Sequence, residues 1–268
     1  MAIVADEALL QQVVAIARRA AQRIMEVYAR DFDVNHKADR SPLTEADLAA
    51  HQEIVDGLQS LTPQTPVLSE ESSHVDYQQR RHWQQYWLVD PLDGTREFIK
   101  RNGEFTVNIA LIDCQQPVLG VVVVPVTGQC YSALRGHGAF CDGPDGVRRL
   151  QVRAFNPADV VIAGSRSHGG ARLSHFLDRI GPHRLVSIGS SLKSCLVAEG
   201  VADIYPRLGP TSEWDTAAAQ CVVEAAGGIL TDIHLQPLRY NTKESLLNPE
   251  FLVIGDPRHD WRRYLPQE

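Results

Sequence analysis

Residues 87–98 of this 268-residue chain read Trp87-Leu88-Val89-Asp90-Pro91-Leu92-Asp93-Gly94-Thr95-Arg96-Glu97-Phe98. The apolar run that ends at Val89 predicts a buried strand, and because Pro91 cannot donate to a sheet, we expect the strand to end there. Gly94-Thr95 then predicts a helix start, so the turn would bring Asp90 and Asp93 together beside free helical N–H groups. Carboxylate oxygens favour Mg²⁺ and a helix N-terminus favours phosphate. The stretch therefore indicates a metal-assisted phosphate site.

A plain turn is the alternative interpretation of these residues. Two solvated acids and a helix cap would give the same short pattern, and short patterns also arise by chance. The order of features, with a buried strand, a proline, an acid pair and a helix start, weakens that alternative. The rest of the sequence decides between the two interpretations.

Three segments, taken together, resemble the signatures of a known family. They are residues 87–98, the upstream acidic segment Leu68-Ser69-Glu70-Glu71, and Glu213-Trp214-Asp215-Thr216-Ala217-Ala218-Ala219 with its continuation Glu224-Ala225-Ala226-Gly227-Gly228. Their order over about the whole chain is similar to the inositol monophosphatase superfamily of Mg²⁺-dependent, lithium-sensitive phosphatases. Within it, residues 103–111, 165–168 and 189–193 most resemble the 3'(2'),5'-bisphosphate nucleotidases.

Composition sets limits on partners and location. The net charge of −7 argues against a nucleic acid polymer as partner, although bound cations would let an acidic site take a small anion. The five cysteines are odd in number and lack CxxC spacing, which argues against a disulfide framework and a zinc site. We see no signal peptide and no apolar run of the ~20 residues that a membrane span needs. We expect a cytoplasmic monomer or homodimer, and the resemblance adds peripheral association with the inner membrane.

The pattern of elements predicts an α/β protein, layered in the α+β manner. Two leading helices, over 5–30 and from Thr44 onward, precede a run of strands as far as 152, and strands alternate with helices from 160. We expect a sub-domain over 1–155 that carries the metal-binding motif and a second over 156–268 that carries substrate-binding segments. The resemblance implies an αβαβα sandwich.

Smaller features carry expectations of their own. Residues 35–42 and 74–84 are polar and predict exposed connections, and Gly136, Gly138 and Gly143 predict a turn. In the second helix, Leu48, Val55 and Leu58 are expected to form the buried face.

Four carboxylates are candidate metal ligands: Glu70, Asp90, Asp93 and Asp215. Neighbouring residues on a strand face opposite ways, so one of Glu70 and Glu71 faces the metal, and the resemblance selects Glu70. Asp215 alone would equally be an acid that stabilises its own helix dipole. The resemblance implies that Asp215 is a metal ligand and that the backbone carbonyl of Leu92 is a further one. It also implies on the order of two or three Mg²⁺ ions.

Thr95 and Asp47 are the candidate catalytic pair. By resemblance, Thr95 orients the attacking water and Asp47 holds its hydroxyl. The local alternatives are a helix cap for Thr95 and a first-turn acid for Asp47 in the helix that Thr44 caps. Gly94 suits the close approach of the backbone to phosphate.

The remaining substrate contacts are expected from two segments that follow strands. Ser165, Ser167 and His168 lie in the first, and Ser190, Ser191 and Lys193 lie in the second, with Glu70, Gly94, Thr95 and Asp215 contacting the phosphate that is cleaved. Lys193 and the hydroxyls would hold a second phosphate. The resemblance implies hydrolysis of adenosine 3',5'-bisphosphate to AMP in sulfate assimilation, with the related phosphosulfate as a further substrate. The rivals are an inositol or sugar phosphatase with the same metal centre and a non-catalytic nucleotide sensor.

Overall fold

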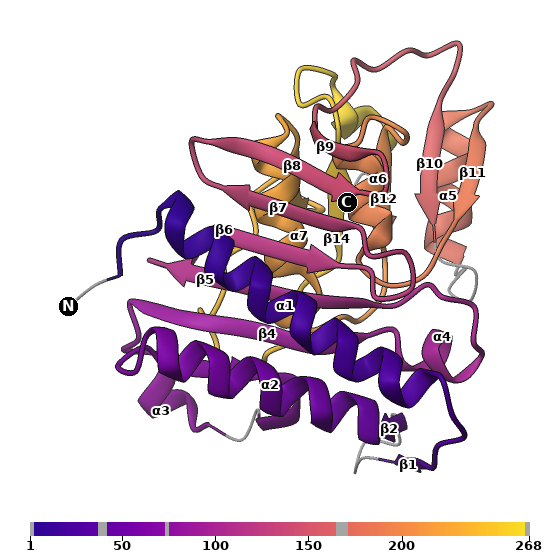
Figure 1. Cartoon of the computed structure of the whole chain (residues 1–268). Coiled ribbons are helices and arrows are strands. Elements are labelled where there is room, and N and C mark those ends of the chain that lie inside the picture. The colour runs from indigo at the N-terminus through magenta and orange to yellow at the C-terminus, as the bar shows by residue number, and fades with distance from the viewer. Residues whose placement is uncertain (1–2, 37–41, 73–74, 165–170, 266–268) are drawn as a thin grey trace.

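A seven-stranded sheet forms the centre of the N-terminal half (Figure 1). The computed structural model describes residues 3–36, 42–72, 75–164 and 171–265. Across the sheet the strands run in chain order: β3 (Val67–Ser69), β4 (Gln85–Asp93), β5 (Thr106–Asp113), β6 (Gln116–Val123), β7 (Cys130–Leu134), β8 (Gly138–Gly143) and β9 (Gly146–Arg149). The β3–β4 pair is parallel and is joined by the long segment 70–84, whereas the other five pairs are antiparallel and can be joined by shorter connections.

Both faces of this sheet are covered. Helices α1 (Glu7–Tyr28) and α2 (Glu45–Leu61) pack on one face, and α7 (Glu213–Ala225) packs on the other. In β5, Val107 and Ile109 join the cluster under α1 and α2, whereas Ala110 joins the cluster under α7. The period of two therefore holds, but with apolar residues on both faces.

A five-stranded sheet forms the second layer of strands. Its order is β11 (Arg184–Ser187), β10 (Val161–Gly164), β12 (Ile204–Arg207), β14 (Phe251–Ile254) and β13 (Ile229–Asp232). Helices α6 (Leu192–Ala198) and α7 lie between the two sheets, and α5 (Ala171–Ile180) and η2 (Trp261–Tyr264) cover the outer face. The layers follow the predicted αβαβα order. The division into two sub-domains at 155 stays a prediction, since α6 and α7 pack into one core with strands of both sheets.

Three expectations about connections hold only in part: the chain does turn at Gly136 and most of the described residues of 74–84 are not buried, whereas 37–41 lie outside the described residues. A small antiparallel sheet of β1 (Val34–His36) and β2 (Pro42–Thr44) occupies part of 35–42, and β8 occupies the glycine-rich segment from 138. The 74–84 segment contains a short helix, α3 (Tyr77–Arg80), and the side chain of Arg80 is buried because it binds Asn241 and the carbonyl of Glu244. The polar sequence of 74–84 predicted that Arg80 is exposed, but residues of a distant loop accept hydrogen bonds from its guanidinium inside the protein.

The buried face of α2 also differs from the expectation. Leu58 is buried as predicted, but Leu48 is 50% exposed and Val55 is only half-buried. The face runs through Asp47, Ala50 and Ile54, because the polar side chain of Asp47 finds its partners inside the protein. No helix in the described ranges is long and apolar enough to cross a bilayer.

Helix α7 lies very close to the sheet at Gly120 of β6. A Cβ atom there would stand 2.4 Å from the carbonyl oxygen of Ala218 and 2.7 Å from Cβ of Cys221. Both atoms belong to a packed helix and cannot move aside cheaply.

We expect Gly120→Ala to destabilise the protein by about 1–3 kcal/mol, because the methyl group overpacks this contact. The free energy of unfolding, measured by urea denaturation, tests the expectation. Gly209→Ala is the matched control, since no atom lies within 4 Å of its added Cβ. Equal stability of the two variants would contradict the described packing of α7 on β6.

Candidate active site

A β-bulge at the end of β4 shapes the acidic part of the site. Asp90 pairs with Asn108 and Asp93 pairs with Thr106, so Pro91 and Leu92 together oppose a single residue of β5. The prediction that the strand ends at Pro91 is therefore wrong. A proline inside a bulge does not need to donate to the ladder, and the strand continues to Asp93.

Gly94 turns the chain directly after the bulge. Its φ is +97°, a left-handed conformation that favours glycine, and it is the N-cap of the short helix α4 (Thr95–Ile99). The bulge and this turn bring the carboxylates of Asp90 and Asp93, the carbonyl of Leu92 and the hydroxyl of Thr95 to one pocket.

Carboxylates from three separate segments line this pocket, whose volume is about 360 Å³. Glu70 lies in η1 (Glu70–Ser72) directly after β3, Asp90 and Asp93 come from β4, and Asp215 lies in the first turn of α7. Burial raises the pKa of Asp90 well above its usual range, and the charges of Glu70, Asp93 and Asp215 add to the effect. Burial and then the charge of Asp93 raise the pKa of Asp215 to about 8.

This donor set suits a hard divalent cation. Such an ion would remove the mutual repulsion that the raised pKa values report, and oxygen ligands are those it prefers. Among the described residues, no three carboxylate, imidazole or thiol groups form a complete metal cage. The number of ions and the ligand set of Glu70, Asp90, Leu92, Asp93 and Asp215 therefore stay predictions.

Asp47 fulfils both of its proposed structural roles. One oxygen accepts from the backbone N–H of Thr44 at 2.8 Å and from its hydroxyl at 2.6 Å, which completes a capping box at the start of α2. The other oxygen accepts the hydroxyl of Thr95 at 3.2 Å, which confirms the predicted contact. The Thr95 hydroxyl also lies 3.4 Å from the carbonyl oxygen of Leu92. Asp47 thus ties α2 to the turn after the bulge.

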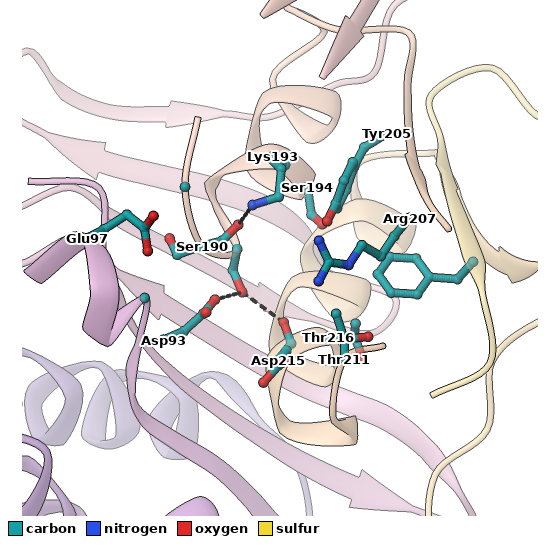
Figure 2. A pocket seen from close by; sticks show the side chains of 14 residues that line it. Asp93, Glu97, Ser190, Lys193, Ser194, Tyr205, Arg207, Thr211, Asp215 and Thr216 are labelled. Atoms are coloured by element: carbon teal, nitrogen blue, oxygen red, sulfur yellow. Dashed lines mark hydrogen bonds between the residues drawn. The ribbon is translucent and has the colours of Figure 1, made fainter. Parts of the chain in front are cut away.

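Ser191 holds the acidic residues rather than facing open space. Its hydroxyl lies 2.8 Å from Oδ2 of Asp93 and 2.8 Å from the carbonyl oxygen of Asp215, and it accepts from Nδ2 of Asn108 at 2.9 Å. Figure 2 labels Asp93 and Asp215, with dashed lines for the first two contacts. This network links β4, β5, α6 and α7 at one point. A direct contact between Ser191 and substrate stays a prediction.

A second pocket, of about 140 Å³, adjoins the first and contains cations. Lys193 is buried, donates to the carbonyls of Ser190 and Ile188, and lies 5.3 Å from the ring centre of Tyr205. Burial lowers the pKa of Lys193 to about 8, although the nearby charge of Asp93 acts in the opposite direction. The hydroxyl of Ser190 is buried and has no hydrogen-bond partner among the described residues, so it is available to a ligand.

Arg207 is a site residue that the sequence analysis missed. It ends β12 and lines both pockets, and Figure 2 shows its guanidinium directed into the second one. Its Nη2 donates to the carbonyl of Pro210 at 2.9 Å, while its buried Nε has no partner in the described part of the chain. The available signal was its place at the carboxyl end of a strand in an α/β layer.

The loop before α6 is fixed by contacts with the 103–111 segment. Glu104 accepts the backbone N–H of Gly189 at 2.9 Å, and a Cβ at Gly189 would stand 2.7 Å from the carbonyl oxygen of Glu104. Two of the segments that resemble the nucleotidases are thus in direct contact. The third, with Ser165, Ser167 and His168, lies outside the described residues, so its substrate contacts stay predictions.

Comparison with known proteins identifies the family. The model of the inositol monophosphatase family matches residues 5–259. The chain belongs to this family. It is 55% identical over 247 residues to the 3'(2'),5'-bisphosphate nucleotidase CysQ of Escherichia coli K12, which covers 91% of this chain and 99% of that protein. It is 40% identical to CysQ of Haemophilus influenzae, over 96% of each chain.

A solved structure agrees with these matches. The crystal structure of CysQ from Bacteroides thetaiotaomicron, described as a bacterial member of the inositol monophosphatase family, has a TM-score of 0.81 and 40% identity to this chain. The match covers 93% of this chain and 97% of that one. The predicted family, its layered fold and the particular similarity to bisphosphate nucleotidases are confirmed.

We expect Asp90→Asn to raise the stability of the metal-free protein, because folding forces buried Asp90 either to keep its charge among like charges or to take up a proton, and the amide needs neither. The amide oxygen can still accept from the N–H of Leu92, as Oδ1 of Asp90 does at 3.1 Å. A gain of roughly 1 kcal/mol would raise Tm by about 2–4 °C in a chain of this size.

MgCl₂ should raise the Tm of the unaltered protein and should raise that of Asp90→Asn much less. Thermal unfolding with EDTA and with Mg²⁺ measures both effects. Asp145→Asn, in the exposed turn between β8 and β9, is the charge-matched control. An identical response of the Asp90 and Asp145 variants would contradict a cation site at the bulge.

Proposed function

We propose that the chain is a Mg²⁺-dependent 3'(2'),5'-bisphosphate nucleotidase that hydrolyses the 3'-phosphate of adenosine 3',5'-bisphosphate to give AMP and phosphate. The observation that carries the proposal is a pair of adjoining pockets: an acidic one that Glu70 and Asp90 line, and a second one, here called the cationic pocket, to which Lys193 contributes its ammonium group. They share lining residues, among them Asp93, Arg207 and Asp215. The names of the similar CysQ proteins support the same activity.

The acidic pocket would hold the phosphate that is cleaved. Bound Mg²⁺ would neutralise phosphate charge, acidify a water and stabilise the departing oxygen. Glu70, Asp90, Asp93, Asp215 and the carbonyl of Leu92 would bind the ions. The backbone around Gly94 leaves room for phosphate oxygens, since this residue carries no side chain.

Thr95 and Asp47 would orient the attacking water. Because the Thr95 hydroxyl donates its proton to Asp47, its lone pairs remain available to accept a proton of that water. The buried carboxylate fixes the direction of this hydroxyl and does not itself need to contact the substrate. No covalent intermediate with the protein is required.

The cationic pocket would bind the second phosphate. The guanidinium of Arg207 is permanently charged, and its buried Nε lacks an acceptor that a phosphate oxygen would supply. A bound phosphate dianion would also favour the charged form of Lys193, whose pKa of about 8 leaves it mostly protonated at neutral pH. A monophosphate such as inositol 1-phosphate has no second dianion to offer these groups. The phosphosulfate donor of sulfate activation carries an anion in the same place and is the second candidate substrate.

We expect Asp93→Asn to remove nearly all activity while the fold is retained, because a neutral amide replaces a charged ligand at a site that works by charge neutralisation. Phosphate release from adenosine 3',5'-bisphosphate, with circular dichroism as a check of folding, measures the effect. Asp145→Asn should keep full activity. Substantial turnover by folded Asp93→Asn would exclude this residue as a metal ligand.

Substrate choice provides a separate test of the cationic pocket. A charge-assisted hydrogen bond contributes roughly 1.5–3 kcal/mol, or about ten- to a hundredfold in kcat/KM. Lys193→Met and Arg207→Gln should each lower kcat/KM by about that factor for adenosine 3',5'-bisphosphate and much less for adenosine 3'-monophosphate. Arg149→Gln, on the exposed strand β9, should change neither value.

The outcome separates the proposal from its rival. Equal losses on both substrates would show that Lys193 and Arg207 do not bind the 5'-phosphate. Faster hydrolysis of inositol 1-phosphate than of the bisphosphate by the unaltered enzyme would favour an inositol phosphatase with the same metal centre.

A further inference from the structure

Helix α2 contacts the candidate site at two places through side chains on one face. Asp47 and His51 are four residues apart in the helix and therefore lie one above the other. Asp47 accepts the Thr95 hydroxyl, as described above. One turn further along, Nδ1 of His51 lies 2.9 Å from the hydroxyl oxygen of Ser69.

Ser69 connects this contact to the acidic pocket. It is fully buried, it is the last residue of β3, and it pairs in parallel register with Val89 of β4. The next residues along the chain are Glu70, which opens η1, and Asp90 in β4, and both line the acidic pocket. The position of Ser69 therefore sets where the backbone of Glu70 begins.

We propose that His51 is a positioning residue, which holds Ser69 so that the carboxylate of Glu70 stays in reach of the metal ions. With Asp47, it makes α2 the element that fixes the spacing between Glu70 and Thr95. The inference rests on the proposed function, because it assigns Glu70 to the metal centre.

Repulsion among the carboxylates explains why Glu70 would need to be held in place. The charge of Glu70 raises the pKa of both Asp90 and Asp215, so the three carboxylates repel one another. Asp90 and Asp215 lie within a long strand and a long helix, whereas Glu70 opens a three-residue 3-10 turn. A ligand on a short turn needs an external anchor to stay near like charges, and a hydrogen bond behind it serves that purpose.

His51 can provide the anchor without a charge of its own. Burial lowers the pKa of its imidazole, against the opposing charge of Asp56, and this favours the neutral ring. A neutral ring does not repel an approaching cation. The contact with Ser69 is thus a hydrogen bond between uncharged groups.

The competing explanation is that His51 only attaches α2 to the sheet. The protein contains a comparable helix-to-sheet contact far from Glu70, made by a hydroxyl that also donates to the carbonyl of Leu58 in α2. At the other end of α2, Nε1 of Trp87 donates to the hydroxyl of Thr62 at 2.9 Å, and Trp87 lies at the far end of β3 from Glu70. Thr62→Val removes that helix-to-sheet hydrogen bond and leaves the metal-proximal one intact.

Direct titration with Mn²⁺, followed by electron paramagnetic resonance of the free ion, tests the inference without substrate. His51→Ala should raise the Kd for Mn²⁺ about three- to tenfold, the range that the loss of one hydrogen bond gives. Thr62→Val should leave this Kd unchanged even if it lowers Tm as much. His51→Asn should restore most of the affinity, because its side-chain amide places a polar atom where Nδ1 of histidine lies.

The activity should show the same split. For His51→Ala, the Mg²⁺ concentration that gives half-maximal phosphate release should rise by the same factor as the Kd, with kcat at saturating Mg²⁺ nearly retained. Equal Mn²⁺ affinities of His51→Ala and the unaltered protein would overturn the inference, as would equal losses in His51→Ala and Thr62→Val. Either result would leave the proposed function standing, whereas a failure of the unaltered protein to bind Mn²⁺ would refute the metal centre itself.

Discussion

Repulsion among carboxylates in a poorly solvated pocket is the constraint around which this end of the molecule is arranged. The described partners of Asp90, Asp93 and Asp215 are neutral donors: the N–H of Leu92, the side chains of Ser191 and Asn108, and the N–H of Ser212. Neutral donors fix the direction of a carboxylate without cancelling its charge. Their repulsion is therefore left for a bound cation to relieve, as proposed, and the raised pKa values of Asp90 and Asp215 show that without one the folded protein favours their protonated forms.

The layered fold supplies the rigidity that this arrangement requires. The acids come from η1, β4 and α7, and each of these elements is packed on the seven-stranded sheet or belongs to it. The close contact at Gly120 brings α7 down onto β6, so Asp215 approaches Asp93 from the opposite face to α2. Helices pack on both faces of the sheet near these strand ends. The repelling carboxylates therefore cannot move away from one another without disrupting the packed core.

The sequence predicted the elements well where a single local rule decides, and poorly where distant residues decide. The apolar run before Asp90 gave a buried strand, and Thr44 gave a helix start. The prediction that the strand ends at Pro91 failed because proline is unfavourable in a regular ladder but is tolerated in the bulge that forms where β4 pairs with β5. The polar sequence around Arg80 predicted exposure, but its side chain is buried because its partners lie 161 and 164 residues away in the chain. Arg207 ends a strand, but this position alone did not identify it, since only the strand order brings it beside Asp215.

The adjoining pockets bring cations and carboxylates together, because Lys193 and Arg207 line the same space as Asp93 and Asp215. A ligand of either charge therefore meets both kinds of group. Metal ions alone would approach Lys193 and Arg207, and a phosphate alone would approach Asp93 and Asp215, so each ligand meets some repulsion when it binds first. A bisphosphate bound together with cations removes both penalties, because each supplies the charge that the other lacks. Each ligand then raises the affinity for the other by the same factor, as linkage requires. On the proposed function, Lys193 and Arg207 would thus favour a bisphosphate over a monophosphate through the bound cations as well as through direct contact.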